Sequence, residues 1–148
     1  MDRVVSPPDA PVSATGHTAG FVTIGRAECL LLLDTVDVGR VVYTENALPA
    51  AHPVTFLRDG EEIIFRTGSP VKAAAAAKRA VVGFQADRIQ PDRGCWSVLG
   101  IGTTYEITEP TRLADLDHRL PRPWLPDHDG FVLAIALRLL TGRHVAAL

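Results

Sequence analysis

The segments of this chain that have strand composition include hairpin pairs and show no regular alternation with helices. The clearest turn is Asp59-Gly60, a strong hairpin signal between a strand that begins at Pro53 and a returning strand over Glu62–Thr67. Further strands are predicted over Arg40–Thr44, Ala80–Asp87 and Trp96–Ile107. The pattern argues against alternating strands and helices in a parallel sheet. It favours a mainly antiparallel β-barrel of about six strands with peripheral helices.

The remaining segments supply helices, a loop and a tail. Helices are predicted over Gly25–Asp34, Pro70–Arg79 and Pro110–Leu120, and a loop over Pro49–His52. Phe131–Leu140 is apolar on both faces, so a strand buried on both sides is expected, although its length also allows a helix. Residues 1–20 are rich in Pro, Ser, Ala, Thr and Gly and are expected to be a flexible tail, which leaves one domain over residues 21–148.

The strand over Trp96–Ile107 carries its glycines on one face. Gly100, Gly102 and Thr104 alternate with larger residues such as Leu99 and Ile101. Glycines along one face of a long strand indicate a bend, or the close approach of another backbone or a ligand.

Charge and cysteine content narrow the class of protein. The formal net charge of the 148 residues is −2 and the basic residues are scattered, so no general nucleic-acid or membrane-surface binder is expected. Cys29 and Cys95 do not have the spacing of metal ligands. No signal peptide is visible, so we expect a cytoplasmic protein without a disulfide between these cysteines. His118 and His128, with Asp117, Asp127 and Asp129 nearby, match no zinc pattern, and no metal is predicted.

The stretch from Arg66 to Lys72 reads as a strand end, a turn and the start of a helix. Ser69 suits the N-cap and Pro70 the first helical position. Lys72 then falls in a first turn without a carboxylate, where a cation costs about 0.3–1 kcal/mol. A phosphate group would reverse that sign, and Arg66 would add a charge-assisted hydrogen bond. The stretch therefore predicts a phosphate-binding corner, with an ordinary helix start and a solvated lysine as the alternative.

Several short pieces together resemble a known family. They are Glu28-Cys29-Leu30, Val38-Gly39-Arg40, His52-Pro53-Val54, Phe65-Arg66-Thr67 with Ser69 and Lys72, Trp96-Ser97-Val98-Leu99 with Gly102, Pro123-Trp124 and Thr141-Gly142-Arg143. In order and spacing they resemble the flavin-binding split barrels of the pyridoxamine 5′-phosphate oxidase-like superfamily. The resemblance runs from about Thr23 to Val145. It implies a split β-barrel and a homodimer that binds two FMN molecules at the subunit interface.

The resemblance also implies roles for individual residues. The strand bearing His52, Pro53, Val54 and Thr55 is expected to run along the flavin ring and offer backbone groups to its polar edge. Arg66 and Thr67 are expected at the phosphate and ribityl chain, and Ser69 and Lys72 at the phosphate. Trp96 and Ser97 are expected to approach the cofactor from the second subunit, with Trp124 and Arg143 near the ring.

Two features of the sequence limit how far these family roles can be assigned to its residues. Arg66 and Thr67 are adjacent on a strand, so their side chains should point to opposite faces, and Thr67 would then contribute through its N–H. The chain also has no counterpart of the Tyr, Arg and Ser set that holds pyridoxine phosphate in the enzyme that names the superfamily. Vitamin B6 synthesis is therefore not predicted, and no catalytic side chain is assigned.

The leading hypothesis is an FMN-dependent oxidoreductase that moves hydride between a small organic substrate or a nicotinamide donor and the flavin. One alternative keeps the fold but binds the deazaflavin F420, whose longer acidic tail would need Arg66, Lys72, Lys78 and Arg79. The other is a non-enzymatic protein that stores or senses a flavin or haem.

Overall fold

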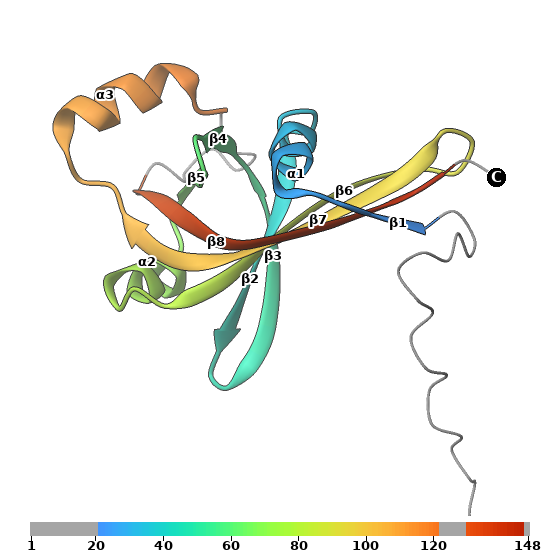
Figure 1. Ribbon diagram of the computed structural model, residues 1–148. Coiled ribbons are helices and arrows are strands. Elements are labelled where there is room, and N and C mark those ends of the chain that lie inside the picture. Colours follow the sequence, from blue (N-terminus) through green and yellow to red (C-terminus); the bar gives the residue numbers. More distant parts are fainter. Residues whose placement is uncertain (1–20, 122–129, 147–148) are drawn as a thin grey trace, which may run out of the picture.

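The computed structural model describes residues 21–121 and 130–146 (Figure 1). The tail predicted over residues 1–20 and the candidate site residue Trp124 lie outside them. The described elements are, in order, β1 (Phe21–Ile24), α1 (Arg26–Leu33), β2 (Val38–Glu45), β3 (Leu48–Thr55), β4 (Leu57–Asp59), β5 (Glu62–Thr67), α2 (Pro70–Ala77), β6 (Val81–Gln90), β7 (Gly94–Glu106), α3 (Pro110–Arg119) and β8 (Phe131–Val145). None of these helices is long and apolar enough to span a membrane.

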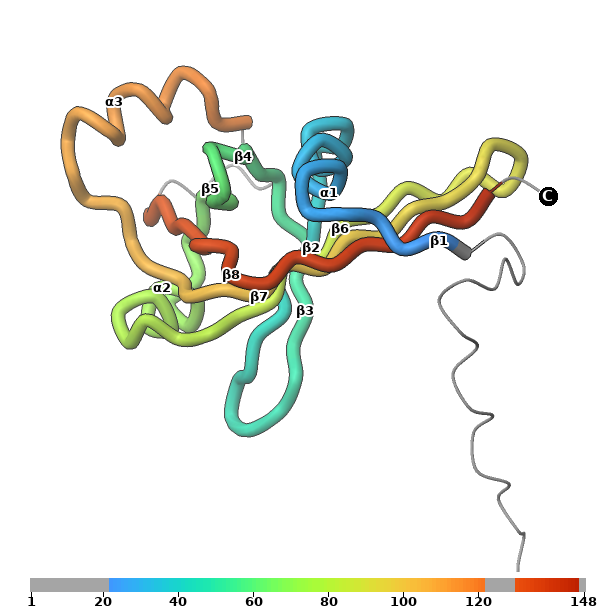
Figure 2. The backbone as a smooth tube through the Cα atoms, in the orientation of Figure 1, coloured from blue at the N-terminus to red at the C-terminus, as the bar shows by residue number. Residues whose placement is uncertain are grey.

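The strands form a single antiparallel sheet in the order β3-β2-β6-β7-β8-β5-β4, with β1 paired to β8. Figure 1 shows this sheet curling into a half-barrel, with β6, β7 and β8 continuing as a long arm beside β1 to the right of the view. The β2–β3 hairpin projects separately toward the bottom. The tube in Figure 2 shows the same two projections. The predicted antiparallel split barrel is confirmed, and the sheet exceeds about six strands because β1 and β4 are short additions of four and three residues.

The prediction of a loop over Pro49–His52 is wrong, because these residues belong to β3. Asn46 and Ala47 both have positive φ, at 51° and 62°, and form a two-residue hairpin turn that sets Glu45 opposite Leu48. The turn lacks the usual glycine, and prolines normally interrupt strands. Pro49 and Pro53 are tolerated because β3 lies at the edge of the sheet, where a residue without an N–H costs no ladder hydrogen bond.

Two apolar cores lie on opposite faces of the sheet. Along β5, Ile63 and Phe65 are buried in the main core on the concave face, whereas Ile64 is buried in a second core under α3. Strand β8 alternates in the same way, with Leu133 in the main core and Ala134 in the second. Both strands are therefore apolar on both sides, which confirms the strand predicted from Phe131.

The glycines of β7 permit the close approach of β8. A Cβ built on Gly102 would stand 1.8 Å from the carbonyl oxygen of Ala136, so no larger residue fits there without moving the backbone. The register between the two strands shifts between Ile101 and Gly102, which introduces an irregularity where the sheet bends. The expectation of a bend and a close backbone contact is confirmed.

Charged side chains fix α3 against the sheet. Arg112 donates to the hydroxyl of Tyr105 at 2.8 Å and to Glu62 at 2.9 Å, and the carboxylate of Glu109 caps the first turn of the helix. Burial, followed by the hydrogen bond to Glu62, raises the pKa of Tyr105, so the hydroxyl keeps its proton at neutral pH. This network holds the helix over the second core.

The turn at Ala47 predicts a simple gain in stability. Replacing Ala47 with glycine should raise the free energy of unfolding in urea by about 0.5–1 kcal/mol, because the positive φ strains any Cβ. The matched control is Ala51→Gly, at an exposed position of β3 with ordinary strand geometry, which should lower stability. A loss of stability in Ala47→Gly would contradict the turn conformation.

Candidate functional site

The start of α2 has the local structure that the sequence predicts. The Ser69 hydroxyl accepts a hydrogen bond from the Lys72 amide at 3.3 Å, and Pro70 begins the helix. The Thr67 hydroxyl accepts from the Ser69 amide at 3.0 Å. Because these hydroxyls already occupy two amides, an anion at this end would depend chiefly on the lysine ammonium.

Lys72 is a buried cation. Its side chain enters the concave face beside Tyr43, Phe65 and Thr104, and only 8% of the residue is exposed. Burial lowers its pKa, because the charged form loses hydration. Within the part of the chain that the structure describes, the ammonium has no hydrogen-bond or ion-pair partner. Lys72 is therefore largely buried rather than fully solvated, and its ammonium keeps some contact with solvent.

Tyr43 lines the same space as Lys72 and contacts His52 of β3. The Tyr43 hydroxyl lies 3.0 Å from Nδ1 of His52, and the two rings meet nearly edge to face at 86°. His52 is opposite Val41 in the sheet, so its side chain shares the concave face with Tyr43 and Val54. Pro53 and Thr55 alternate onto the other face. Sequence reasoning missed Tyr43, although its alternation with Val41 was visible in the predicted strand.

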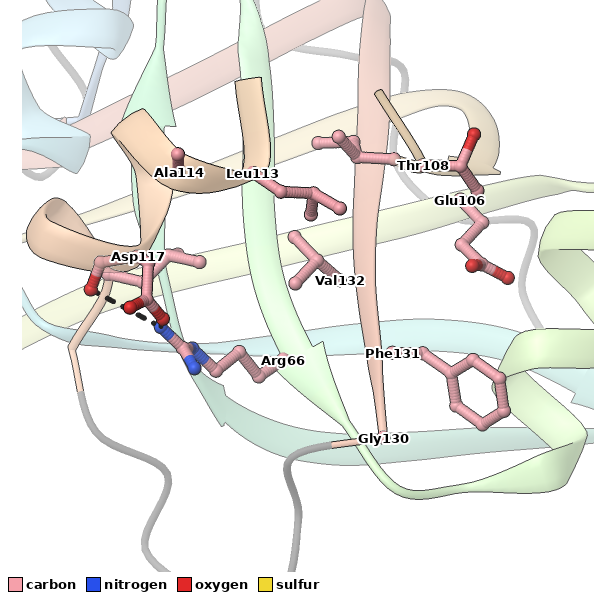
Figure 3. A pocket seen from close by; sticks show the side chains of 11 residues that line it. Arg66, Glu106, Thr108, Leu113, Ala114, Asp117, Gly130, Phe131 and Val132 are labelled. Atoms are coloured by element: carbon pink, nitrogen blue, oxygen red, sulfur yellow. Dashed lines mark hydrogen bonds and ion pairs between the residues drawn. The ribbon is translucent and has the colours of Figure 1, made fainter. Parts of the chain in front are cut away.

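Arg66 belongs to the opposite face. Its Nη2 donates to the Asp117 carboxylate of α3 at 2.8 Å (Figure 3), whereas the neighbouring Thr67 is buried on the concave side. The expected alternation of these two residues is confirmed. It corrects the prediction that Arg66 and Lys72 bind the same phosphate, because the sheet separates their side chains.

The remaining expected residues lie on the long arm. Trp96 is buried and pairs with His144 across β7 and β8, and Ser97 pairs with Arg143. Along β7, Trp96 is separated from Thr104, beside Lys72, by up to about 26 Å of strand. One copy of the chain therefore does not bring Trp96, Ser97 and Arg143 to the lysine.

No group of three or more His, Cys, Asp or Glu side chains suited to a metal occurs among the residues described. In the sequence, His118 and His128 with their neighbouring aspartates match no zinc pattern and are not predicted as a metal site. Of that group, His128, Asp127 and Asp129 lie outside the described residues.

Comparison with known proteins relates most of the chain to one family. The family described as pyridoxamine 5′-phosphate oxidase matches residues 25–144. An uncharacterized protein of Mycobacterium tuberculosis is 36% identical over 132 residues, which cover 85% of this chain and 86% of that protein.

Solved structures share the fold. A Corynebacterium glutamicum protein assigned as a pyridoxamine 5′-phosphate oxidase has a TM-score of 0.76 and 26% identity, with 90% of this chain and 99% of that chain covered. An FAD-binding protein of Mycobacterium smegmatis has a TM-score of 0.69 and 24% identity, with 84% and 98% covered. An FAD- and haem-binding protein of the same species has a TM-score of 0.65 and 21% identity, with 84% and 73% covered.

The lowered pKa of Lys72 predicts a pH-dependent contribution to stability. Between the folded-state pKa and the unfolded value of about 10.4, the unfolded chain binds more protons, so the free energy of unfolding rises with pH. Lys72→Met should therefore be more stable than the wild type near neutral pH, and this advantage should shrink as the pH approaches about 10. Urea titrations at a series of pH values measure the difference.

The matched control is Lys78→Met, at the exposed end of α2, which should show no such trend. A stability difference between the wild type and Lys72→Met that stays constant with pH would contradict the burial of the ammonium.

Proposed function

Because this chain belongs to the pyridoxamine 5′-phosphate oxidase family, we propose that it binds a flavin beside Lys72, at the start of α2. The phosphate of FMN would accept from the Lys72 ammonium, and the ring would lie along β3. A bound flavin would supply hydride transfer with a small organic substrate or a nicotinamide donor. The residues of this chain would bind and orient it.

The observation that carries this proposal is the largely buried Lys72, whose ammonium has no partner among the described residues. A buried charge costs free energy unless it is paired, and none of the described side chains pairs with it. An anionic group would compensate that cost. The space beside the lysine inside the fold is only about 10 Å³, so the phosphate would lie outside it.

The edge strand β3 suits the polar edge of a flavin ring. Within the described residues it pairs only with β2, so backbone groups on its open side are left to a ligand. His52 adds a ring nitrogen on the concave face, held by the Tyr43 hydroxyl. We propose that the backbone of this strand contacts the flavin ring at His52, Pro53, Val54 and Thr55. The side chains of His52 and Val54 lie on the concave face.

We also propose a homodimer with the cofactor at its interface. On the convex face, Val42, Gly83, Ile101 and Leu139 stand in register across four strands, and Leu139 is 62% exposed. A partly exposed apolar row of this kind is typical of an interaction surface. In such a dimer the arm residues Trp96, Ser97 and Arg143 would reach the flavin of the other subunit.

FMN is the proposed cofactor, because its terminal phosphate matches a single buried cation. FAD and haem are the alternative ligands, because proteins with a similar fold bind FAD, or FAD and haem. F420 is less well supported, because Arg66 is already paired with Asp117 and lies on the other face from Lys72.

Flavin titration of the purified protein tests the site. The wild type should bind FMN at micromolar concentrations, and Lys72→Met should bind about 10–100-fold more weakly, because a charged hydrogen bond contributes about 1.5–3 kcal/mol. Lys78→Met and Arg66→Gln should bind like the wild type. FAD, F420 and haem titrated in parallel identify the preferred ligand.

Two results would refute the proposal. One is the absence of flavin binding by the wild type at micromolar concentrations. The other is unchanged affinity in Lys72→Met, whose thermal stability without flavin also shows that the variant folds.

A charge on the apolar row tests the dimer. Leu139→Asp should give a monomer by analytical ultracentrifugation and weaken flavin binding, because burying the new carboxylate against a second copy is costly. Leu31→Asp, at a 64% exposed position of α1, is the control and should remain dimeric. A Leu139→Asp protein that stays dimeric would rule out this interface.

A further inference from the structure

A cavity of about 580 Å³ lies on the convex side, between α3 and the strands β5 and β8 (Figure 3). Its size is within the range of small-molecule sites. None of its described lining residues lines the space around Lys72, and the sheet separates the two. The cavity therefore needs an explanation of its own.

One part of the cavity is apolar. Leu113 of α3 faces Val132 of β8 across it, as Figure 3 shows. Ile107 and Leu120 add further apolar surface. These side chains suit the hydrocarbon or aromatic body of a ligand.

At the other end, the guanidinium of Arg66 has donors without hydrogen-bond partners among the described residues. All the hydrogen bonds that its guanidinium makes within the described residues come from Nη2, which contacts only Asp117. Nε is buried and has no partner there. A buried guanidinium nitrogen without an acceptor is costly, and a carboxylate is its best geometric complement.

Asp117 presents the complementary acceptor. Only its Oδ1 is bonded to Arg66, and its side chain is 68% exposed. Unused donors and an unused carboxylate oxygen therefore lie next to each other. An α-amino acid carries the matching pair of groups side by side, a carboxylate for the Arg66 donors and an ammonium for the Asp117 oxygen.

We propose that this cavity binds a zwitterionic α-amino acid with an apolar side chain. The ligand carboxylate accepts from Arg66, its ammonium donates to Asp117, and its side chain packs against Leu113 and Val132. A simple organic anion fits less well, because Glu106 and Asp117 give the described lining one more negative charge than positive. The zwitterion adds no net charge and leaves the Arg66–Asp117 ion pair intact.

Ligand-detected NMR on the full-length protein tests the choice of ligand, with L-phenylalanine as the probe. L-Phenylalanine should bind at least about tenfold more tightly than 3-phenylpropionate, which lacks the ammonium, and phenethylamine, which lacks the carboxylate. Equal or tighter binding of either analogue overturns the proposal, as does the absence of L-phenylalanine binding at millimolar concentrations.

Variants locate the site. Arg66→Gln and Asp117→Asn should each weaken L-phenylalanine binding by about tenfold or more, since each removes one charged contact. Ala114→Trp, on the exposed surface of α3, should block the cavity. The control Asp115→Asn alters a carboxylate on the same helix that pairs with Arg119 and does not line the cavity.

The outcomes separate this site from the proposed flavin site. Lys72→Met should bind L-phenylalanine like the wild type, and Arg66→Gln should still bind flavin, which also shows that it folds. Tighter binding of 3-phenylpropionate by Asp117→Asn would indicate a plain anion site and would contradict the zwitterion. Unchanged L-phenylalanine binding in Arg66→Gln and Ala114→Trp would exclude the cavity.

Discussion

The alternation of side chains along β5 is the constraint on which the rest of the structure depends. Because this strand is buried on both faces, Ile63 and Phe65 enter one core while Ile64 enters the other. The same alternation continues at its end, where Arg66 turns toward α3 and Thr67 toward the concave face. A single strand thus separates two polar sites that the sequence suggested were one.

One copy of the chain does not bring the predicted cofactor residues together. Lys72, Tyr43 and His52 lie together near the β2–β3 hairpin, whereas Trp96 and Arg143 are carried away on the long arm. The prolines of β3 remove N–H groups from its open edge, which discourages association by strand addition. The proposed dimer instead uses the apolar row around Leu139 on the convex face.

Much of this fold could be predicted from the sequence, because short-range chemistry determines it. The helix start at Ser69 and Pro70 and the hairpin at Asp59-Gly60 follow from local backbone preferences. The turn at Asn46-Ala47 was missed because neither residue is glycine. The burial of Lys72 and the pairing of Arg66 with Asp117, 51 positions away in the chain, depend on long-range packing that no local pattern records.

The central claim is that Lys72, rather than Arg66, receives the anionic group of the cofactor. The most direct measurement is a crystal structure of the flavin-loaded protein. The phosphate oxygens are predicted within about 3 Å of the Lys72 ammonium. Arg66 should still contact Asp117 on the far side of the sheet. A phosphate bound by Arg66, or a flavin bound away from the start of α2, would contradict the claim.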